Sequence, residues 1–70
     1  MPKETFTIPK IHCAGCVGAI KFELGELPGV TTVEGDMLRR RIEVEYTAPA
    51  TLEGIVALLH EINYPPQQDN

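Results

Sequence analysis

Apolar and polar residues repeat along this chain with two periods, which predict strands and helices in a definite order. A period of two, typical of a strand buried on one face, occurs over about residues 4–8 and again over 41–46. The clearer of these runs is 41–46, in which three apolar residues alternate with two glutamates. Residues 30–34 predict a further strand between them, followed by a turn over 35–39.

Two other segments repeat their apolar residues at helical spacing. The first covers about residues 16–27 and ends at Pro28-Gly29, a pair that stops a helix and makes a turn. The second is capped by Thr51 and runs to about Ile62. Its predicted core stripe consists of Leu52, Ile55, Val56, Leu59 and Ile62.

This order of elements predicts a ferredoxin-like βαββαβ fold of the α+β class, with an antiparallel sheet and two helices on one face. We expect the fourth strand to be short or absent, because Pro65 and Pro66 precede a polar end. An open sheet edge there could favour dimerisation. Seventy residues make one domain, 1–70, in which 65–70 could serve as a tail or a linker.

Size and charge restrict the class of function. So short a chain has little room for a walled substrate pocket, which argues against an enzyme. The net charge of −4 argues against nucleic acid as a partner, because binding phosphates needs a basic face. The basic run Arg39-Arg40-Arg41 lies at the expected turn, where we expect it to be solvated. No apolar run is as long as that of a signal peptide or a membrane-spanning helix. We therefore expect a cytoplasmic location without membrane insertion.

The candidate chemistry lies in residues 11–16, Ile-His-Cys-Ala-Gly-Cys, which contain both cysteines. Cys13 falls in a loop and Cys16 in the first helical turn, so both can converge on one soft ion. The helix N-terminus favours thiolate over thiol. Two thiolates suit Cu(I), whereas structural zinc sites take four protein ligands. His12 is a candidate accessory ligand, although we expect its ring to point to solvent. We expect His60 to be a solvated helix residue.

With these motifs the chain resembles the heavy-metal-associated (HMA) domain family. This family includes copper chaperones, mercuric-ion binding proteins and N-terminal domains of metal-transporting P-type ATPases. The matching positions cover the family's first strand, metal loop, first helix, helix exit and final turn: Phe6, Ile8, Ile11, Cys13, Cys16, Val17, Ile20, Leu27-Pro28-Gly29-Val30 and Asn63-Tyr64. At position 11 the family usually has an inward-packing Met, and we expect Ile11 to fill a similar volume.

The resemblance implies a non-enzymatic protein that holds one soft metal ion between Cys13 and Cys16. Cu(I) is the expected ion, with Hg(II), Zn(II) and Cd(II) as alternatives. The ion would pass by ligand exchange to a metal-transporting P-type ATPase or another C-x-x-C domain, and a metal-bridged homodimer is a further option. The resemblance also places the ring of Tyr64 over the metal loop, either as a plain core residue or as a modulator of the thiolates.

Small residues next to the first cysteine fit such a transfer. Ala14 and Gly15 would let another protein's cysteine approach the ion, although Gly15 could also serve only the backbone geometry of the loop. Because members of the family dock through complementary charge, the acidic chain favours a basic-faced partner. The sequence is compatible with a free-standing chaperone and with one domain of a transporting ATPase.

Two other classes of function compete with metal transfer. A thiol–disulfide oxidoreductase also uses C-x-x-C at a helix start, but its thioredoxin-like fold needs a longer chain and a cis-proline opposite the motif. A pure interaction module with a vestigial metal site is opposed by the intact cysteine pair.

Overall fold

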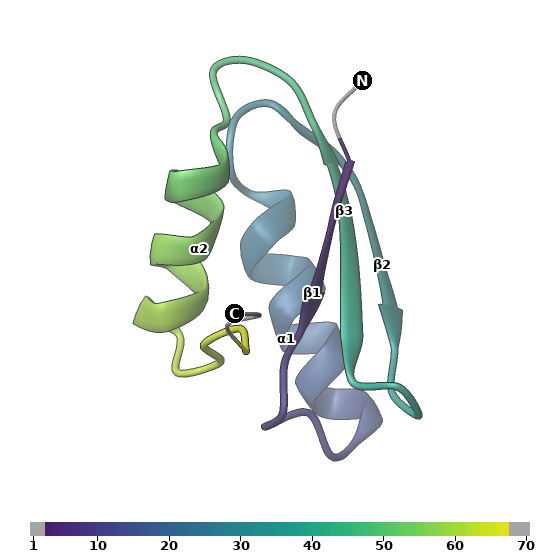
Figure 1. The fold of residues 1–70 in the computed structure, drawn as a ribbon. Coiled ribbons are helices and arrows are strands. Elements are labelled where there is room, and N and C mark those ends of the chain that lie inside the picture. The colour runs from purple at the N-terminus through teal and green to yellow at the C-terminus, as the bar shows by residue number, and fades with distance from the viewer. Residues whose placement is uncertain (1–2, 68–70) are drawn as a thin grey trace.

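The computed structural model describes residues 3–67, which form a sheet layer and a helix layer (Figure 1). The elements follow in the order β1 (Lys3–Thr7), α1 (Ala14–Gly25), β2 (Val30–Asp36), β3 (Arg41–Tyr46) and α2 (Leu52–Glu61). β3 lies at the centre of the sheet and pairs antiparallel with β1 on one side and β2 on the other. Both helices cover the same face. The predicted ferredoxin-like α+β fold is therefore confirmed.

The hydrophobic core fills the space between the sheet and the two helices. Every second residue of β3 points into it, as the alternating pattern predicts: Ile42, Val44 and Tyr46. The helices and the region around β1 contribute the other buried residues: Phe6, Ile8, Ile11, Cys16, Ile20, Leu24, Ile55 and Leu59. The prediction that Leu52 belongs to the core stripe is wrong, since its side chain is 40% exposed. Leu52 is the first residue of α2 and lines an open hollow beside β1 instead.

The boundaries of two elements differ from the sequence-based expectation. α1 begins at Ala14, ahead of its first apolar repeat, because the small exposed residues of its first turn give no periodic signal. β2 continues to Asp36, and the turn occupies residues 37–40. There the Asp36 Oδ1 atom accepts a hydrogen bond of 3.2 Å from the Arg39 backbone N–H. The predicted cap of α2 is confirmed, because the Thr51 hydroxyl accepts from the Gly54 N–H at 3.0 Å.

The segment after α2 runs beside β1 but forms no strand within the described residues. Its Gln67 N–H donates to the Thr7 carbonyl at 2.6 Å, which is the one backbone bond between residues 62–67 and β1. Pro65 and Pro66 have no N–H to donate, which explains the missing ladder. The expectation of a short or absent fourth strand is thus confirmed as far as residue 67, and 68–70 lie outside the described residues.

β2 crosses the first turn of α1 at a point where a side chain has no room. A Cβ atom added to Gly35 would overlap the Cγ1 atom of Val17 and lie 3.3 Å from the Cδ1 atom of Ile42. Val17 directly follows Cys16. The bare backbone of Gly35 therefore sets how deeply the cysteine-bearing turn of α1 sits on the sheet.

We expect Gly35→Ala to destabilise the domain by about 1–3 kcal/mol, the usual cost of overpacking a core. Gly18→Ala is the matched control, because a Cβ at Gly18 meets nothing within 4 Å. In an exposed helix interior this second change should stabilise by up to about 1 kcal/mol. Urea unfolding of the metal-free protein measures both. Equal effects of the two substitutions would show that the contact with Val17 is unimportant.

Candidate metal centre

The loop between β1 and α1 is fixed to the core at two points. Ile8 and Ile11 are both fully buried, and the Ile11 N–H donates to the Ile8 carbonyl at 3.1 Å. Pro9 and Lys10, between them, are exposed. Ile11 packs inward, as expected for the position where the HMA family usually has Met. His12 and Cys13 therefore leave the core from a rigid base.

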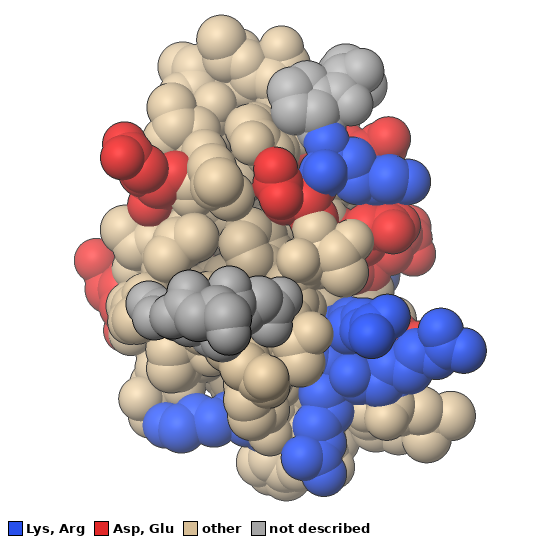
Figure 2. Space-filling model, in the orientation of Figure 1, with Lys and Arg blue, Asp and Glu red and all other residues tan. Residues whose placement is uncertain are grey.

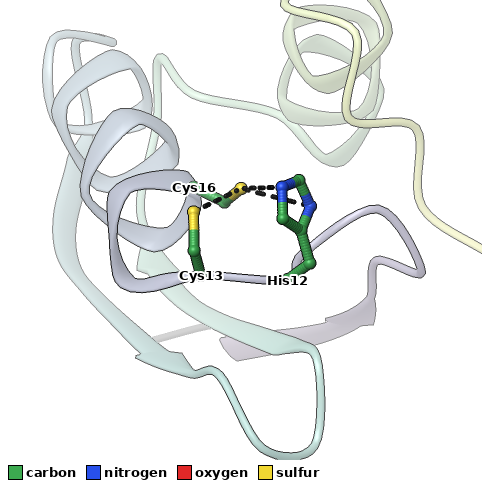
Figure 3. Close-up of side chains that lie close together, drawn as sticks. All are labelled: His12, Cys13 and Cys16. Carbon is green, nitrogen blue, oxygen red and sulfur yellow. Dashed lines mark hydrogen bonds between the residues drawn. The ribbon is translucent and has the colours of Figure 1, made fainter.

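The two cysteines converge at the start of α1 (Figure 3). Cys13 is the N-cap residue, extended and exposed, and Cys16 is buried in the first turn. The Cys16 N–H donates to the Cys13 carbonyl at 3.1 Å, and the two Sγ atoms are 3.3 Å apart. This separation is well above the roughly 2.05 Å of a disulfide bond, and both thiols are free. The structure thus brings together the pair that the sequence singled out.

The surroundings of Cys16 favour its ionised form. Hydrogen bonds from the Tyr64 hydroxyl, the His12 backbone N–H and the Cys13 side chain lower the pKa of Cys16 from 9.0 to about 6, although burial acts in the opposite direction. The first turn of α1 contains no acidic residue that would repel the charge. The contact with Cys16 correspondingly raises the pKa of Tyr64. At neutral pH the lowered pKa therefore favours the thiolate form of this buried sulfur.

His12 is exposed, but its ring turns toward Cys16 rather than away from it (Figure 3). The Cys16 Sγ atom lies 3.7 Å from Nδ1 and 4.0 Å from Nε2. Nδ1 is also 2.8 Å from the Lys10 carbonyl, an acceptor, so we assign the proton to Nδ1. That assignment leaves the lone pair on Nε2. His12, Cys13 and Cys16 offer donor atoms within 4.8 Å of one another, so His12 stands close enough to act as a third donor.

Other predicted residues separate into those near the sulfurs and those far from them. The Tyr64 hydroxyl is the largest cause of the lowered pKa of Cys16, which favours a role as a modulator of the thiolate. His60 is exposed on α2, where it lines the hollow beside β1 instead of the metal loop. A Cβ on Gly15 would be 3.7 Å from the Cys13 Sγ, an ordinary contact, and its backbone φ is not in the left-handed region. Glycine is therefore not needed there for the backbone.

One group that shapes the site, a backbone carbonyl, could not be predicted from the sequence. The carbonyl of Lys10 orients the imidazole of His12, and any residue at position 10 would present the same backbone oxygen. Only the turn between Ile8 and Ile11 places it beside the ring. Contacts of this kind depend on loop conformation, which side-chain patterns do not encode.

Tyr64→Phe should raise the pKa of Cys16 from about 6 toward 9, because the largest contribution to the lowered value is lost. Thiolate absorbance at 240 nm, followed in metal-free reduced protein from pH 4.5 to 8.5, measures the change. Tyr46→Phe is the matched control, since this other tyrosine is buried in the core on β3. An unchanged midpoint in Tyr64→Phe would show that the hydroxyl does not stabilise the thiolate.

A lowered pKa in the folded state also makes stability depend on pH. The contribution of Cys16 is complete above the pKa of the unfolded thiol, near 9, and is lost as the pH falls through about 6. The free energy of unfolding of the metal-free wild type, minus that of Cys16→Ser, should therefore increase between pH 6 and pH 9. Urea unfolding under reducing, anaerobic conditions measures this difference. A difference that is flat or decreases over this range would contradict the assignment.

Sequence comparison matches the described site to a known family. The sequence profile of the heavy-metal-associated domain matches residues 5–65. A COP-associated protein of Helicobacter pylori is 39% identical over 49 residues, which cover 70% of this chain and 74% of that protein. One from Helicobacter felis is 35% identical over 62 residues, or 89% and 94% of the two chains. "Probable copper-importing P-type ATPase A" of Enterococcus hirae is 34% identical over 87% of this chain, which spans 8% of the ATPase.

Solved structures agree with the sequence matches. Apo-CopP from Helicobacter pylori superposes with a TM-score of 0.85 at 32% identity, covering 94% of this chain and all of that one. A structure named CopZ metallochaperone gives a TM-score of 0.88 over 94% of this chain, and at 16% identity it supports the fold alone. The fold, the C-x-x-C loop and the profile that spans nearly the whole chain lead to the same conclusion: this chain belongs to the heavy-metal-associated domain family.

Proposed function

We propose that this domain binds one Cu(I) ion between Cys13 and Cys16 and passes it to a partner with a similar cysteine pair. The observation that carries the proposal is the pair of sulfur atoms 3.3 Å apart, one of which has a pKa of about 6. Two soft, anionic donors at low coordination number suit Cu(I) better than harder ions. One relative, whose name refers to copper import, supports the same ion.

The two cysteines would contribute differently to loading. With bonds of about 2.3 Å, the length of zinc–thiolate bonds, two sulfurs in a linear arrangement around one ion would be about 4.6 Å apart. The observed 3.3 Å is shorter, so the sulfurs must separate when the ion enters. Cys16 is buried and held by Tyr64, whereas Cys13 is exposed. Cys13 is therefore the ligand that moves.

Transfer would follow from the same asymmetry. Ala14 and Gly15 are exposed beside Cys13, and their small side chains leave its sulfur open to another protein. An incoming thiolate would add to the ion as a third ligand, after which Cys13 leaves first and Cys16 second. No bond is made or broken apart from those to the metal, so the domain acts as a carrier and not as an enzyme. A metal-transporting P-type ATPase or another C-x-x-C domain would accept the ion, and a second copy could bridge through it.

Zn(II) is the second candidate ion because of one specific observation. His12 adds a nitrogen donor to the two sulfurs within 4.8 Å. Zinc would still need a fourth ligand from water or a partner. Hg(II) and Cd(II) would use the sulfur pair alone.

The location of the protein follows from the same proposal. No helix of residues 3–67 is long and apolar enough to cross a membrane. We place the carrier in the cytoplasm, where a reducing environment would keep both thiols free.

An anaerobic Cu(I) titration against a chromogenic chelator tests the proposal, with Zn(II) in parallel. We expect one-to-one Cu(I) binding that weakens more than about 100-fold in Cys13→Ser and Cys16→Ser, since even residues that only orient metal ligands contribute 10–100-fold. His12→Ala should change Cu(I) affinity much less, and His60→Ala not at all. Strong zinc binding that depends on His12, together with weak Cu(I) binding, would contradict the copper assignment and identify zinc as the bound ion.

A further inference from the structure

A hollow of about 500 Å³ adjoins the metal loop. Its walls come from the loop after β1, the turn between β2 and β3, and the segment after α2. His12 and Tyr64 line it, and the ring of His12 lies 3.7 Å from the Cys16 sulfur. A molecule seated in the hollow would thus lie next to the metal-binding sulfurs.

The charge of this hollow is opposite to that of the whole chain. Lys10 and Arg40 line it, and none of its lining residues is acidic. A second hollow, on the open face of the sheet, contains Arg39 and Arg41 but also three acidic side chains. In the view of Figure 2, most Lys and Arg side chains gather toward the lower end of the molecule, and Asp and Glu lie mostly above them. The expectation of a basic-faced partner, drawn from the net charge of −4, does not hold beside the metal loop.

Polar groups in the hollow are suited to carboxylates. The Lys10 Nζ atom donates to the Asn63 Oδ1 atom at 3.1 Å, which holds the ammonium group at the rim. Arg40 lines the same hollow and has no salt-bridge partner among the described residues. A guanidinium group binds a carboxylate with two parallel hydrogen bonds. The volume is within the range of pockets that take small molecules rather than protein segments.

We propose that this hollow binds the carboxylates of a small anionic thiol, such as a cysteine-containing peptide. The sulfur of that thiol would then occupy the third position on an ion held by Cys13 and Cys16. The thiol loses its proton to solvent and forms one metal–sulfur bond, and nothing is oxidised or reduced. This second step depends on the proposed function, whereas carboxylate binding does not require the metal.

The test uses metal-free, reduced, ¹⁵N-labelled protein titrated with S-methylglutathione, which has two carboxylates but no free thiol. We expect saturable shift changes in the amide signals, confined to residues 10–12, 40 and 62–64. Arg40→Asn should weaken binding about three- to tenfold, as expected for a partly exposed charged hydrogen bond. Arg40 has a φ of 57°, and asparagine tolerates this left-handed conformation well, so the variant should keep its fold. Lys10→Ala provides a second variant with the same expectation.

Arg39→Asn is the matched control. It removes the same charge from the same turn, but Arg39 faces Asp36 and lines the other hollow. Binding should stay within about twofold of wild type. Three results would overturn the proposal: equal weakening by Arg39→Asn and Arg40→Asn, undiminished binding of the diethyl ester of S-methylglutathione, or no saturable shifts at all. Lys10 and Arg40 would then be available to bind the carboxylates of a protein partner.

A second arm adds the metal and separates this proposal from the copper assignment. Cu(I)-loaded protein is mixed with glutathione or with 2-mercaptoethanol, a neutral thiol, and X-ray absorption counts the sulfurs around copper. A third sulfur should appear at a concentration of glutathione lower than that of 2-mercaptoethanol, and Arg40→Asn should abolish the difference. Should the protein fail to bind Cu(I), the metal-free titration still decides on the hollow. Intact Cu(I) binding without a preference for glutathione would contradict the hollow alone.

Discussion

The burial of Cys16 is the constraint on which the rest of the site depends. Its side chain is 4% exposed and belongs to the hydrophobic core, yet its sulfur must carry a negative charge to bind a soft ion. Burial alone raises the pKa of a thiol. Donors from three places in the chain, the Tyr64 hydroxyl, the His12 backbone and the Cys13 side chain, outweigh that effect. The fold thus stabilises charge where the core meets solvent, and it does so before the metal binds.

In the proposed function, the two chemically identical cysteines would have different roles, one holding the ion and the other releasing it. Cys16 is buried in the core cluster that also contains Ile11 and Ile20, whereas Cys13 is the exposed N-cap residue of α1. A carrier needs both properties, because an ion held by two rigid ligands would exchange slowly and one held by two mobile ligands would be selected poorly. Placing the pair across the boundary of a helix start provides one of each from a three-residue spacing.

Much of the fold and the site could be predicted from the sequence, because the signals are local. Alternation predicted β3, Thr51 predicted the start of α2, and the spacing of Cys13 and Cys16 predicted that their sulfurs would meet. Other features depend on segments far apart in the chain and could not be predicted from any local pattern. The fit of Gly35 against Val17 is one, and the exposure of Leu52 at the rim of the sandwich is another. The orientation of His12 depends on a backbone carbonyl, which no side-chain pattern reveals.

The distribution of charge shows why the net charge of a sequence does not predict the local charge at a site. The excess of acidic residues is concentrated partly on the open face of the sheet, where Glu34 pairs directly with Glu43 across β2 and β3. Like charges in such a pair repel by a few tenths of a kcal/mol or more, and the Lys3–Glu43 contact at 3.8 Å offsets part of that cost. The separate hollow beside the metal loop contains Lys10 and Arg40 and has no acidic residue in its lining. Because screening limits exposed charges to about 8–10 Å in physiological salt, a ligand that approaches the metal loop meets these two cations and not the net charge of the chain.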